Sequence, residues 1–502
     1  MLRILGSPKQ LCNGVTRRDW LAAGSLGVLG LSLPDVLRLQ QAQAAPGNPP
    51  AASFGKAKNV ILLYLFGGPS QLETFDFKPD APAEVRGAFQ PIASALPGCD
   101  VCEFLPHVAQ VMDRVTVVRS LTHPWNFHGM QWATTGLPEG TIPFEETQRI
   151  PQHWPFLGSM YAYLDEQRNG PKARGSVPDN IILPFPLSSR RPAAMYARPH
   201  GAFLGSQYDP IFTEFRGEAT RSMVRRSFGP PAEIFDPYLG VKPGCRFEIA
   251  PEAQLPEDIT LDRIDGRRSL LAQLEEARRA REGAARQRPA SVQLMDQHQQ
   301  LAFSLLDSAA IRQALDLDQE TPAQREAYGM TLFGQGALQA RRLVEAGSRF
   351  VTVIWDEFGQ LNAGWDTHVD HYNRMKHDLL PGFDLAFSAL IRDLEDRGML
   401  DDTLVLVMNE MGRTPRLEGD GRGHWGRAYC NLFAGAGIRR GNIVGRTDKI
   451  GGTVEERPAS AKDVLATLYH LLGVDPHTMV RDRLDRPMPL VPYGGVIGEM
   501  VG

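Results

Sequence analysis

Continuous runs of apolar residues, each ending abruptly in glycine or polar residues, recur along this 502-residue chain. The first run, KNVILLYLF, stops at Gly67 and Gly68. Comparable runs occupy residues 114–120, 180–185, 348–355 and 402–410. Apolar residues that follow one another without alternation are typical of parallel strands buried on both faces. These runs therefore predict the strands of a largely parallel, buried sheet.

Helical patterns lie between the predicted strands. In residues 379–398 the apolar positions recur at spacings of three and four, and Gly398 supplies a C-terminal cap. Strands that alternate with helices predict an α/β fold with a doubly wound, largely parallel sheet. Residues 257–345 interrupt the alternation, because they are rich in Ala, Leu, Glu, Arg and Gln and lack an apolar run. We interpret them as a helical insertion.

The same patterns divide the chain into five parts. The predicted parts are a signal peptide (residues 1–44), a linker (45–58), the first half of the α/β domain (59–256), the helical insertion (257–345) and the second half (346–502). The first half contains a loop-rich stretch with many Pro, Gly, Trp and His residues. Long loops at strand ends commonly carry recognition, so substrate selection is expected there.

The first residues have the pattern of an export signal. Arg17 and Arg18 precede an apolar stretch of about 13 residues, and AQA at Ala42–Ala44 offers a cleavage point. This arrangement predicts a twin-arginine signal, the translocation machinery as a partner, and a periplasmic or other extracytoplasmic location. A bilayer span needs about 20 apolar residues, so a stable membrane span is not expected.

Composition narrows the classes of partner. Hydrophobic residues make up 42% and charged residues 22%, which is ordinary globular usage. The formal net charge is −4, and nucleic-acid binding would need a concentrated basic face, so no nucleic acid is expected as a partner. Cys99 and Cys102 form the one close cysteine pair, and they fit either a local disulfide or two buried thiols.

Polar clusters follow several of the predicted strands. They include the segment from Gly67 to Asp76, the pair Asp356 and Glu357, the pair Asn409 and Glu410, and the GRGHWG loop that contains His424. In open parallel sheets, ligands bind outside the carboxyl ends of the strands. The chain therefore predicts one site assembled from these loops.

The densest cluster is GWDTHVDH, which places Asp366, His368, Asp370 and His371 within six positions. Carboxylate and imidazole groups together suit zinc, manganese or iron. Asp366 could equally be an N-cap, with Asp370 as a charge at the start of a helix. The segment alone leaves both interpretations open.

Glu410 and His424 are further candidates for metal ligands. A carboxylate at the end of a strand as apolar as TLVLVM would be costly to bury unless it were paired or bound to a metal. Pairing of Glu410 with Arg413 or Arg416 is the alternative. His424 lies in a glycine-rich loop that could reach Glu410, and packing beside Trp425 is its alternative role.

His123 and His128 precede a short predicted helix that ends at Gly136. The free N–H groups of a helix amino terminus suit an anionic group of a substrate. These histidines could bind or protonate a leaving group, or they could pack among the aromatic residues of the loop.

Several stretches together resemble a family of exported bacterial proteins of unknown function, placed beside the sulfatases in the alkaline-phosphatase-like superfamily. The matching stretches are the twin-arginine leader, LLYLFGGPSQLETFDFKP, VVRSLTH, ARRLVEAGSRFVTV, WDTH, NEMGRTP and GHW. The superfamily resemblance implies a metal site that cleaves sulfate or phosphate esters. Asp366 with His368 or His371 resembles its Asp/His pair, and His424 resembles its final histidine.

The chain also departs from the superfamily pattern. Asn126 stands where a Ser, Thr or Cys nucleophile is expected, and Glu410-Met411 replaces an Asp-His pair. Ser70, or Thr122 near His123 and His128, is a substitute candidate for the nucleophile. The first hypothesis is therefore an exported, metal-dependent hydrolase of a small-molecule or glycan anionic ester. The cofactor would be a divalent ion such as zinc, calcium or manganese, bound by Asp366, His368, His371, Glu410 and His424.

The departures also motivate a second hypothesis. A catalytically degenerate protein with this fold could serve outside the cytoplasm as a binding or assembly component, because fold alone does not give function.

Overall fold

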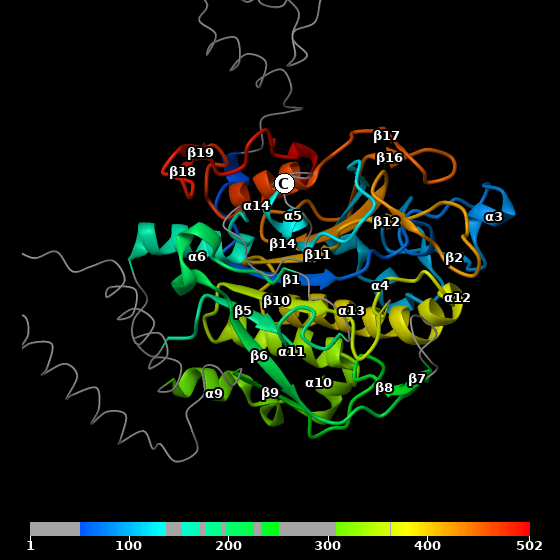
Figure 1. The fold of residues 1–502 in the computed structure, drawn as a ribbon, viewed down its shortest axis with the longest axis horizontal. Coiled ribbons are helices and arrows are strands. Elements are labelled where there is room, and N and C mark those ends of the chain that lie inside the picture. Colours follow the sequence, from blue (N-terminus) through cyan, green and yellow to red (C-terminus); the bar gives the residue numbers. More distant parts are fainter. Residues whose placement is uncertain are drawn as a thin grey trace, which may run out of the picture. The chain divides into compact units, whose positions relative to one another are not determined.

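A nine-stranded mixed sheet forms the centre of the protein in the computed structural model (Figure 1). The structure describes residues 51–136, 153–170, 176–191, 197–224, 232–249, 308–361 and 363–502. In sheet order the strands are β15 (Asn442–Val444), β4 (Val115–Leu121), β14 (Tyr429–Gly435), β11 (Thr403–Met408), β1 (Asn59–Leu65), β10 (Phe350–Trp355), β5 (Asn180–Leu183), β6 (Ile211–Arg216) and β9 (Arg246–Ile249).

Most neighbouring strands of the sheet run parallel. β1 pairs in parallel with both β10 and β11, and β5 continues the parallel set beside β10. β14 is antiparallel to both of its neighbours, β11 and β4, and β9 is antiparallel to β6 at one edge. The expected α/β fold with a largely parallel sheet is therefore confirmed.

Alternate residues of β1 face two separate hydrophobic cores. Ile61 and Leu63 belong to one core, whereas Leu62 and Tyr64 belong to the other. Both sets are fully buried, which explains why the sequence of this strand shows no alternation of apolar and polar residues.

Helices cover both faces of the sheet, because each of the two cores contains residues of several helices. The helices of the first core are α4 (Pro106–Ala109), α9 (Ala309–Leu315), α11 (Leu332–Glu345) and α13 (Leu380–Asp396). Those of the second core are α5 (Met130–Thr135), α6 (Leu157–Asn169) and α14 (Ala461–Leu471).

Short helices and two-stranded sheets lie outside the nine-stranded sheet. Further helices among the described residues are α3 (Ala83–Arg86), α10 (Pro322–Ala327) and α12 (His371–Arg374), which continues into the π-helical turn η8 (Met375–Leu379). The two-stranded pairs are β2 (Pro91–Ile92) with β3 (Val101–Cys102), β7 (Ser222–Val224) with β8 (Glu233–Phe235), β12 (Gly412–Arg413) with β13 (His424–Trp425), β16 (Arg446–Thr447) with β17 (Val454–Glu456), and β18 (Met479–Arg481) with β19 (Pro487–Pro489).

All five predicted apolar runs contain strands, namely β1, β4, β5, β10 and β11. The pattern also located α13, and Gly398 has the left-handed backbone (φ 66°) that ends a helix. The expected signal peptide (residues 1–44) lies outside the described residues. So do residues 257–307 of the expected helical insertion. From the remainder of that insertion, α11 packs directly on the sheet in the first core.

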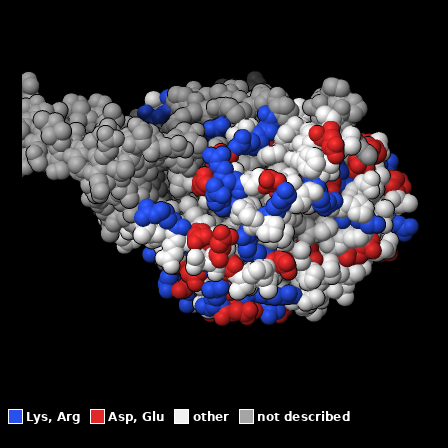
Figure 2. All heavy atoms as spheres, turned by 90° about the horizontal axis from the view of Figure 1, so that it is seen from below, with Lys and Arg blue, Asp and Glu red and all other residues white. Residues whose placement is uncertain are grey.

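Three further observations bear on the expected partners. No helix among the described residues is long and apolar enough to cross a membrane. Cys99 and Cys102 are buried free thiols. Figure 2 shows Lys and Arg interspersed with Asp and Glu on the face seen from below.

Candidate metal centre

Loops from the carboxyl ends of three strands converge at one edge of the sheet. The loop after β4 carries His128, the loop after β10 carries Asp366, and Glu410 follows β11 directly. His424 lies in β13, shortly before β14. Because β14 is antiparallel to β11, its start lies at this same edge.

Two glycines after β1 permit these loops to approach one another. Gly67 (φ 111°) and Gly68 (φ 83°) adopt backbone conformations that other residues rarely reach. A Cβ atom on Gly67 would lie 2.3 Å from the backbone nitrogen of Asp366, and one on Gly68 would lie 2.6 Å from the carbonyl oxygen of Met411. The two glycines therefore let the loop after β1 approach the backbones of the loops that carry Asp366 and Met411.

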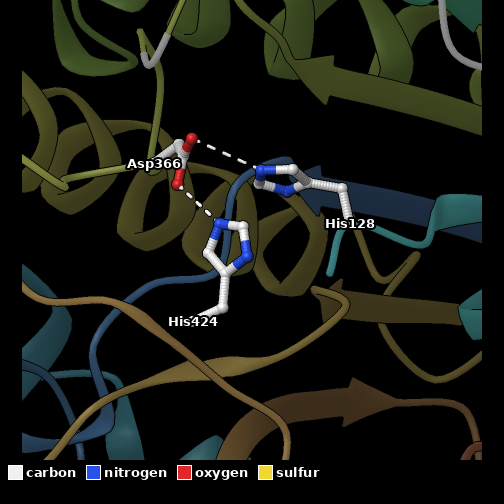
Figure 3. Close-up of side chains that lie close together, drawn as sticks. All are labelled: His128, Asp366 and His424. Atoms are coloured by element: carbon white, nitrogen blue, oxygen red, sulfur yellow. Dashed lines mark hydrogen bonds and ion pairs between the residues drawn. The ribbon is translucent and has the colours of Figure 1, made fainter. Parts of the chain in front are cut away.

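Asp366 lies between His128 and His424 (Figure 3). Its Oδ2 atom is 3.3 Å from Nε2 of His128, and its Oδ1 atom is 3.2 Å from Nε2 of His424. One donor atom from each of the three residues lies within 4.8 Å of the other two. We call His128, Asp366 and His424 the metal-ligand group below.

His128 bridges two carboxylates. Its Nδ1 is 2.9 Å from Oε1 of Glu410, while its Nε2 faces Asp366. Its ring also stacks on Phe66, with the centroids 4.9 Å apart. Burial opposes a charge on the imidazole, but the Asp366 and Glu410 carboxylates outweigh burial and raise the pKa of His128 to about 10. Without a bound cation, His128 is therefore an imidazolium ion that compensates their negative charge.

Glu410 holds the His128 ring through its contact with Nδ1. It is fully buried and accepts hydrogen bonds from the Tyr64 hydroxyl (3.0 Å) and the Gly67 backbone N–H (2.8 Å). The sequence suggested either metal ligation or pairing with Arg413 or Arg416. Instead, Arg413 pairs with Asp366. Glu410 contacts Nδ1 of His128, the ring nitrogen on the side opposite Asp366.

Two buried arginines hold Asp366. Nη2 of Arg413 lies 2.5 Å from Oδ1 of Asp366, and the same guanidinium bonds the Gly68 carbonyl at 2.9 Å. Arg374 donates to the Asp366 carbonyl oxygen at 3.2 Å. Burial favours a protonated carboxyl, but the Arg413 and His128 charges hold the pKa of Asp366 well below its usual range. Asp366 is therefore a carboxylate fixed by both its side chain and its backbone.

His424 lies between two hydrogen-bond acceptors. Its Nδ1 is 3.0 Å from the Asn126 carbonyl oxygen and its Nε2 is 3.2 Å from Oδ1 of Asp366, so a proton on Nδ1 leaves Nε2 available to a cation. Burial also lowers the pKa of His424. Nε2 of His368 lies 2.9 Å from Nε2 of His424 and 3.2 Å from Oδ1 of Asp366. Two imidazole nitrogens this close share either a proton or a cation.

His123 has a different environment from the one expected of an acid or base at the site. Its Nδ1 accepts the Trp125 backbone N–H at 3.1 Å, so its Nε2 donates to the Glu410 carbonyl oxygen at 2.8 Å. Burial lowers the pKa of His123 to about 4. His123 is thus a neutral ring that fixes the loop before His128, which matches the packing role left open by the sequence.

His371 and Ser70 belong to a separate buried cluster around Glu73. Nδ1 of His371 contacts the Thr367 hydroxyl at 2.7 Å, and its Nε2 lies 3.3 Å from Glu73. Ser70 donates a short hydrogen bond to the same carboxylate, which also pairs with Arg422 at 2.5 Å. The structure therefore does not bring His371 into the metal-ligand group, and it buries the Ser70 hydroxyl.

The metal-ligand group fits a divalent transition metal by its donor chemistry. One carboxylate and two imidazole Nε2 atoms are suitable ligands for zinc, manganese or iron. The Nδ1 atom of each ring is held by an oxygen acceptor, Glu410 for His128 and the Asn126 carbonyl for His424. Such acceptors orient the imidazoles of metal sites. His368 is the nearest candidate for a further ligand.

Three contacts of the site have no direct signal in the sequence. Tyr64 occupies a core position of β1, Asn126 acts through its backbone oxygen, and Arg413 pairs with a residue 47 positions earlier. Arg413 lies three residues after Glu410, at a predicted strand end, which is the one feature that marked it in advance.

A family model for proteins of unknown function, DUF1501, matches residues 57–501 of the chain. The chain belongs to the DUF1501 family. Every residue of the metal-ligand group falls within the matched range. No curated protein matches this member of the family.

Solved structures with weak similarity include three enzymes. The PsFucS1 sulfatase of Pseudoalteromonas sp. is 12% identical, with a TM-score of 0.35, over 84% of this chain and 69% of its own. The phosphonate monoester hydrolase of Agrobacterium radiobacter is 12% identical, with a TM-score of 0.32, over 88% and 76%. The lipoteichoic acid synthase LtaP of Listeria monocytogenes is 10% identical, with a TM-score of 0.31, over 89% and 79%.

Proposed function

We propose that this DUF1501 protein is an exported, metal-dependent hydrolase of a sulfate or phosphate ester. The observation that carries the proposal is the position of Asp366 between Nε2 of His128 and Nε2 of His424. Both rings have their Nδ1 atoms occupied, so both can present Nε2 to a shared cation. The resemblance to the alkaline-phosphatase-like superfamily, with its doubly wound sheet, is part of this proposal.

The side chains around the group have separate roles in the proposed reaction. A divalent cation bound there would polarise an ester oxygen and lower the pKa of a bound water towards about 7. Glu410 holds the His128 ring in place, and Arg413 keeps Asp366 ionised. His368 is the most exposed imidazole of the site, with 33% of its side chain accessible, so it can exchange a proton with a leaving group.

Water is the proposed nucleophile. Ser70 is fully buried and bonded to Glu73, and Asn126 has no hydroxyl or thiol. Direct attack by water on sulfur or phosphorus would break the bond to the ester oxygen and release an alcohol and inorganic sulfate or phosphate. The expected covalent role of Ser70 is therefore not part of the proposal.

Export of the protein is proposed from the pattern in which Arg17 and Arg18 precede an apolar stretch and AQA at Ala42–Ala44. Replacement of both arginines by lysine should retain the uncleaved precursor in the cytoplasm, because twin-arginine signals depend on the arginine pair. Cell fractionation and immunoblotting measure this. Unchanged export of the doubly substituted precursor would contradict the proposal.

Hydrolysis is tested with aryl sulfate and aryl phosphate esters after the protein is loaded with zinc, manganese or calcium. We expect turnover that falls at least about 100-fold in His128→Ala and in Asp366→Asn. His377→Ala is the matched control, because His377 is exposed on the same segment as Asp366 and lies outside the group. Metal binding without turnover of either ester class would favour the non-catalytic hypothesis instead.

A further inference from the structure

A pocket of about 250 Å³, lined by polar and apolar atoms in similar measure, borders the loop that carries Asp366. Its walls come from β7, from Gln360 in the loop after β10, and from residues 369–378 around α12. The volume equals roughly eight water molecules at about 30 Å³ each, which is enough for a small organic ring. Because most of its walls follow β10, the pocket lies at the edge of the sheet where ligands bind.

The side chains of the pocket suit a ligand with many hydroxyl groups. Asn373 supplies an amide that both donates and accepts hydrogen bonds. The Gln360 amide nitrogen already donates to Met223 Sδ and the Ser222 hydroxyl to Glu233, so Gln360 and Ser222 offer chiefly their acceptor oxygens. Asp370 adds a carboxylate to the lining. Met223 and Val369 add apolar surface on which the C–H face of a ring could pack.

The charges of the pocket nearly cancel. Asp370 and Asp378 are acidic, Arg374 is basic, and His377 adds an imidazole to the lining. Arg221, outside the lining, contacts Asp378 at 3.4 Å. A site for an anion would need an excess of positive charge, and a site for an organic cation would need an excess of negative charge. A neutral ligand is therefore the best match.

The pocket is connected physically to the metal-ligand group but does not share its donor atoms. Arg374 lines the pocket and donates to the carbonyl oxygens of Gly364 (2.5 Å) and Asp366 (3.2 Å). The Asp366 carboxylate points instead to His128 and His424. One loop thus serves two adjacent binding surfaces.

Two unfavourable backbone features border the pocket. Asp370 has a left-handed conformation (φ 54°), and α12 continues into the π-helical turn Met375–Leu379. Both conformations are uncommon and are found disproportionately at functional sites.

We propose that this pocket binds a neutral, hydroxyl-rich ring, namely a pyranose unit of a saccharide. The polar side chains Gln360, Asp370 and Asn373 would bond the hydroxyl groups, while Val369 contacts the ring face. The site goes beyond the proposed hydrolase activity and does not depend on a bound metal.

Binding is tested by saturation-transfer NMR and calorimetry with the full mature chain and four neutral sugars: glucose, galactose, mannose and N-acetylglucosamine. Each sugar is used at about 10 mM, where a Kd near 1 mM gives about 90% occupancy. Inorganic phosphate and putrescine serve as the anion and cation arms. We expect at least one sugar to bind, and neither charged probe to compete for its site.

Matched variants locate the binding. Asn373→Trp should fill the pocket and weaken sugar binding at least about 10-fold, because Asn373 lines it from an exposed position. Lys376→Trp, exposed on the same segment outside the pocket, should leave binding unchanged, and so should His128→Ala. Absence of sugar binding, equal binding in Asn373→Trp, or binding lost only in His128→Ala would overturn the proposal.

Discussion

The Glu410 carboxylate lies 2.9 Å from Nδ1 of His128 and directs the opposite ring nitrogen towards Asp366. Glu410 is itself fixed by Tyr64 from within β1 and by the Gly67 backbone after that strand. The central strand of the sheet therefore sets the orientation of an imidazole in the loop after β4. A carboxylate behind a metal-binding histidine raises the basicity of the ring and holds its tautomer.

Replacement of Glu410 by glutamine should weaken metal binding by about 10- to 100-fold. The amide oxygen can still accept from Gly67 and His128, but the negative charge is lost. Competition with a chromophoric chelator measures the affinity. Glu84→Gln, the same change at an exposed residue, is the control. Equal affinity of the Glu410→Gln protein and the wild type would show that this carboxylate does not support the site.

The Asn126 side chain should contribute to the position of His424. Its Oδ1 accepts the Gly426 backbone N–H at 2.9 Å, while its carbonyl oxygen accepts from His424. Asn126→Ala removes the first contact, and we expect a metal affinity about 3- to 10-fold lower, measured by chelator competition. Asn126→Asp retains an acceptor at this position and should restore most of the affinity. If both variants bind as the wild type does, the side chain has no positioning role.

His371 should not be needed for metal binding. Its ring contacts Thr367 and Glu73, away from the metal-ligand group, although the sequence offered it as a ligand. His371→Gln should therefore lower the melting temperature while the folded protein retains about one equivalent of metal. Elemental analysis of the folded fraction gives the ratio. A folded His371→Gln protein without metal would restore His371 as a ligand.

Glu73 should make the protein sensitive to acid. Burial opposes ionisation, but Arg422 and His371 lower the pKa of Glu73 from 4.5 to about 2. Since the folded-state pKa is depressed, this contribution is fully present above about pH 4.5 and is lost as the pH falls towards 2. Its size is about 3 kcal/mol, taken from the shift in pKa.

The Glu73→Gln substitution tests this contribution by urea unfolding between pH 7 and pH 3. At pH 7 it should cost about 3–5 kcal/mol, because Arg422 is left buried without its carboxylate. The difference from the wild type should shrink as the pH falls. A difference that stays constant across this range would contradict the assigned pKa.

The central strands of the fold were predictable because each is a continuous apolar run in the sequence. β1, β10 and β11 are buried on both faces, so their apolar runs stand out in the sequence. β14 was missed. Its sequence YCNLFAG contains Asn431, whose side-chain oxygen accepts from the Asn409 backbone within the sheet, and a polar residue interrupts the apolar pattern.

The site was only partly predictable, because its members come from four separate loops. Residue type and strand ends indicated Asp366, His128, His424 and Glu410, but not their division of roles. Which histidine faces Asp366 depends on loop paths set by Gly67 and Gly68 and on the bond from Asn126. His371 is five residues from Asp366, yet its Nε2 faces Glu73 and its Nδ1 faces Thr367.

Anomalous diffraction from crystals of the zinc-loaded protein shows whether a cation lies between Asp366 and the two histidines. We expect one strong peak within about 2.0–2.2 Å of an Asp366 oxygen and of Nε2 of both His128 and His424. The peak should be absent from Asp366→Asn crystals grown in the same way. A zinc peak elsewhere, or crystals of the loaded wild type with no peak at Asp366, would contradict a metal centre at this group.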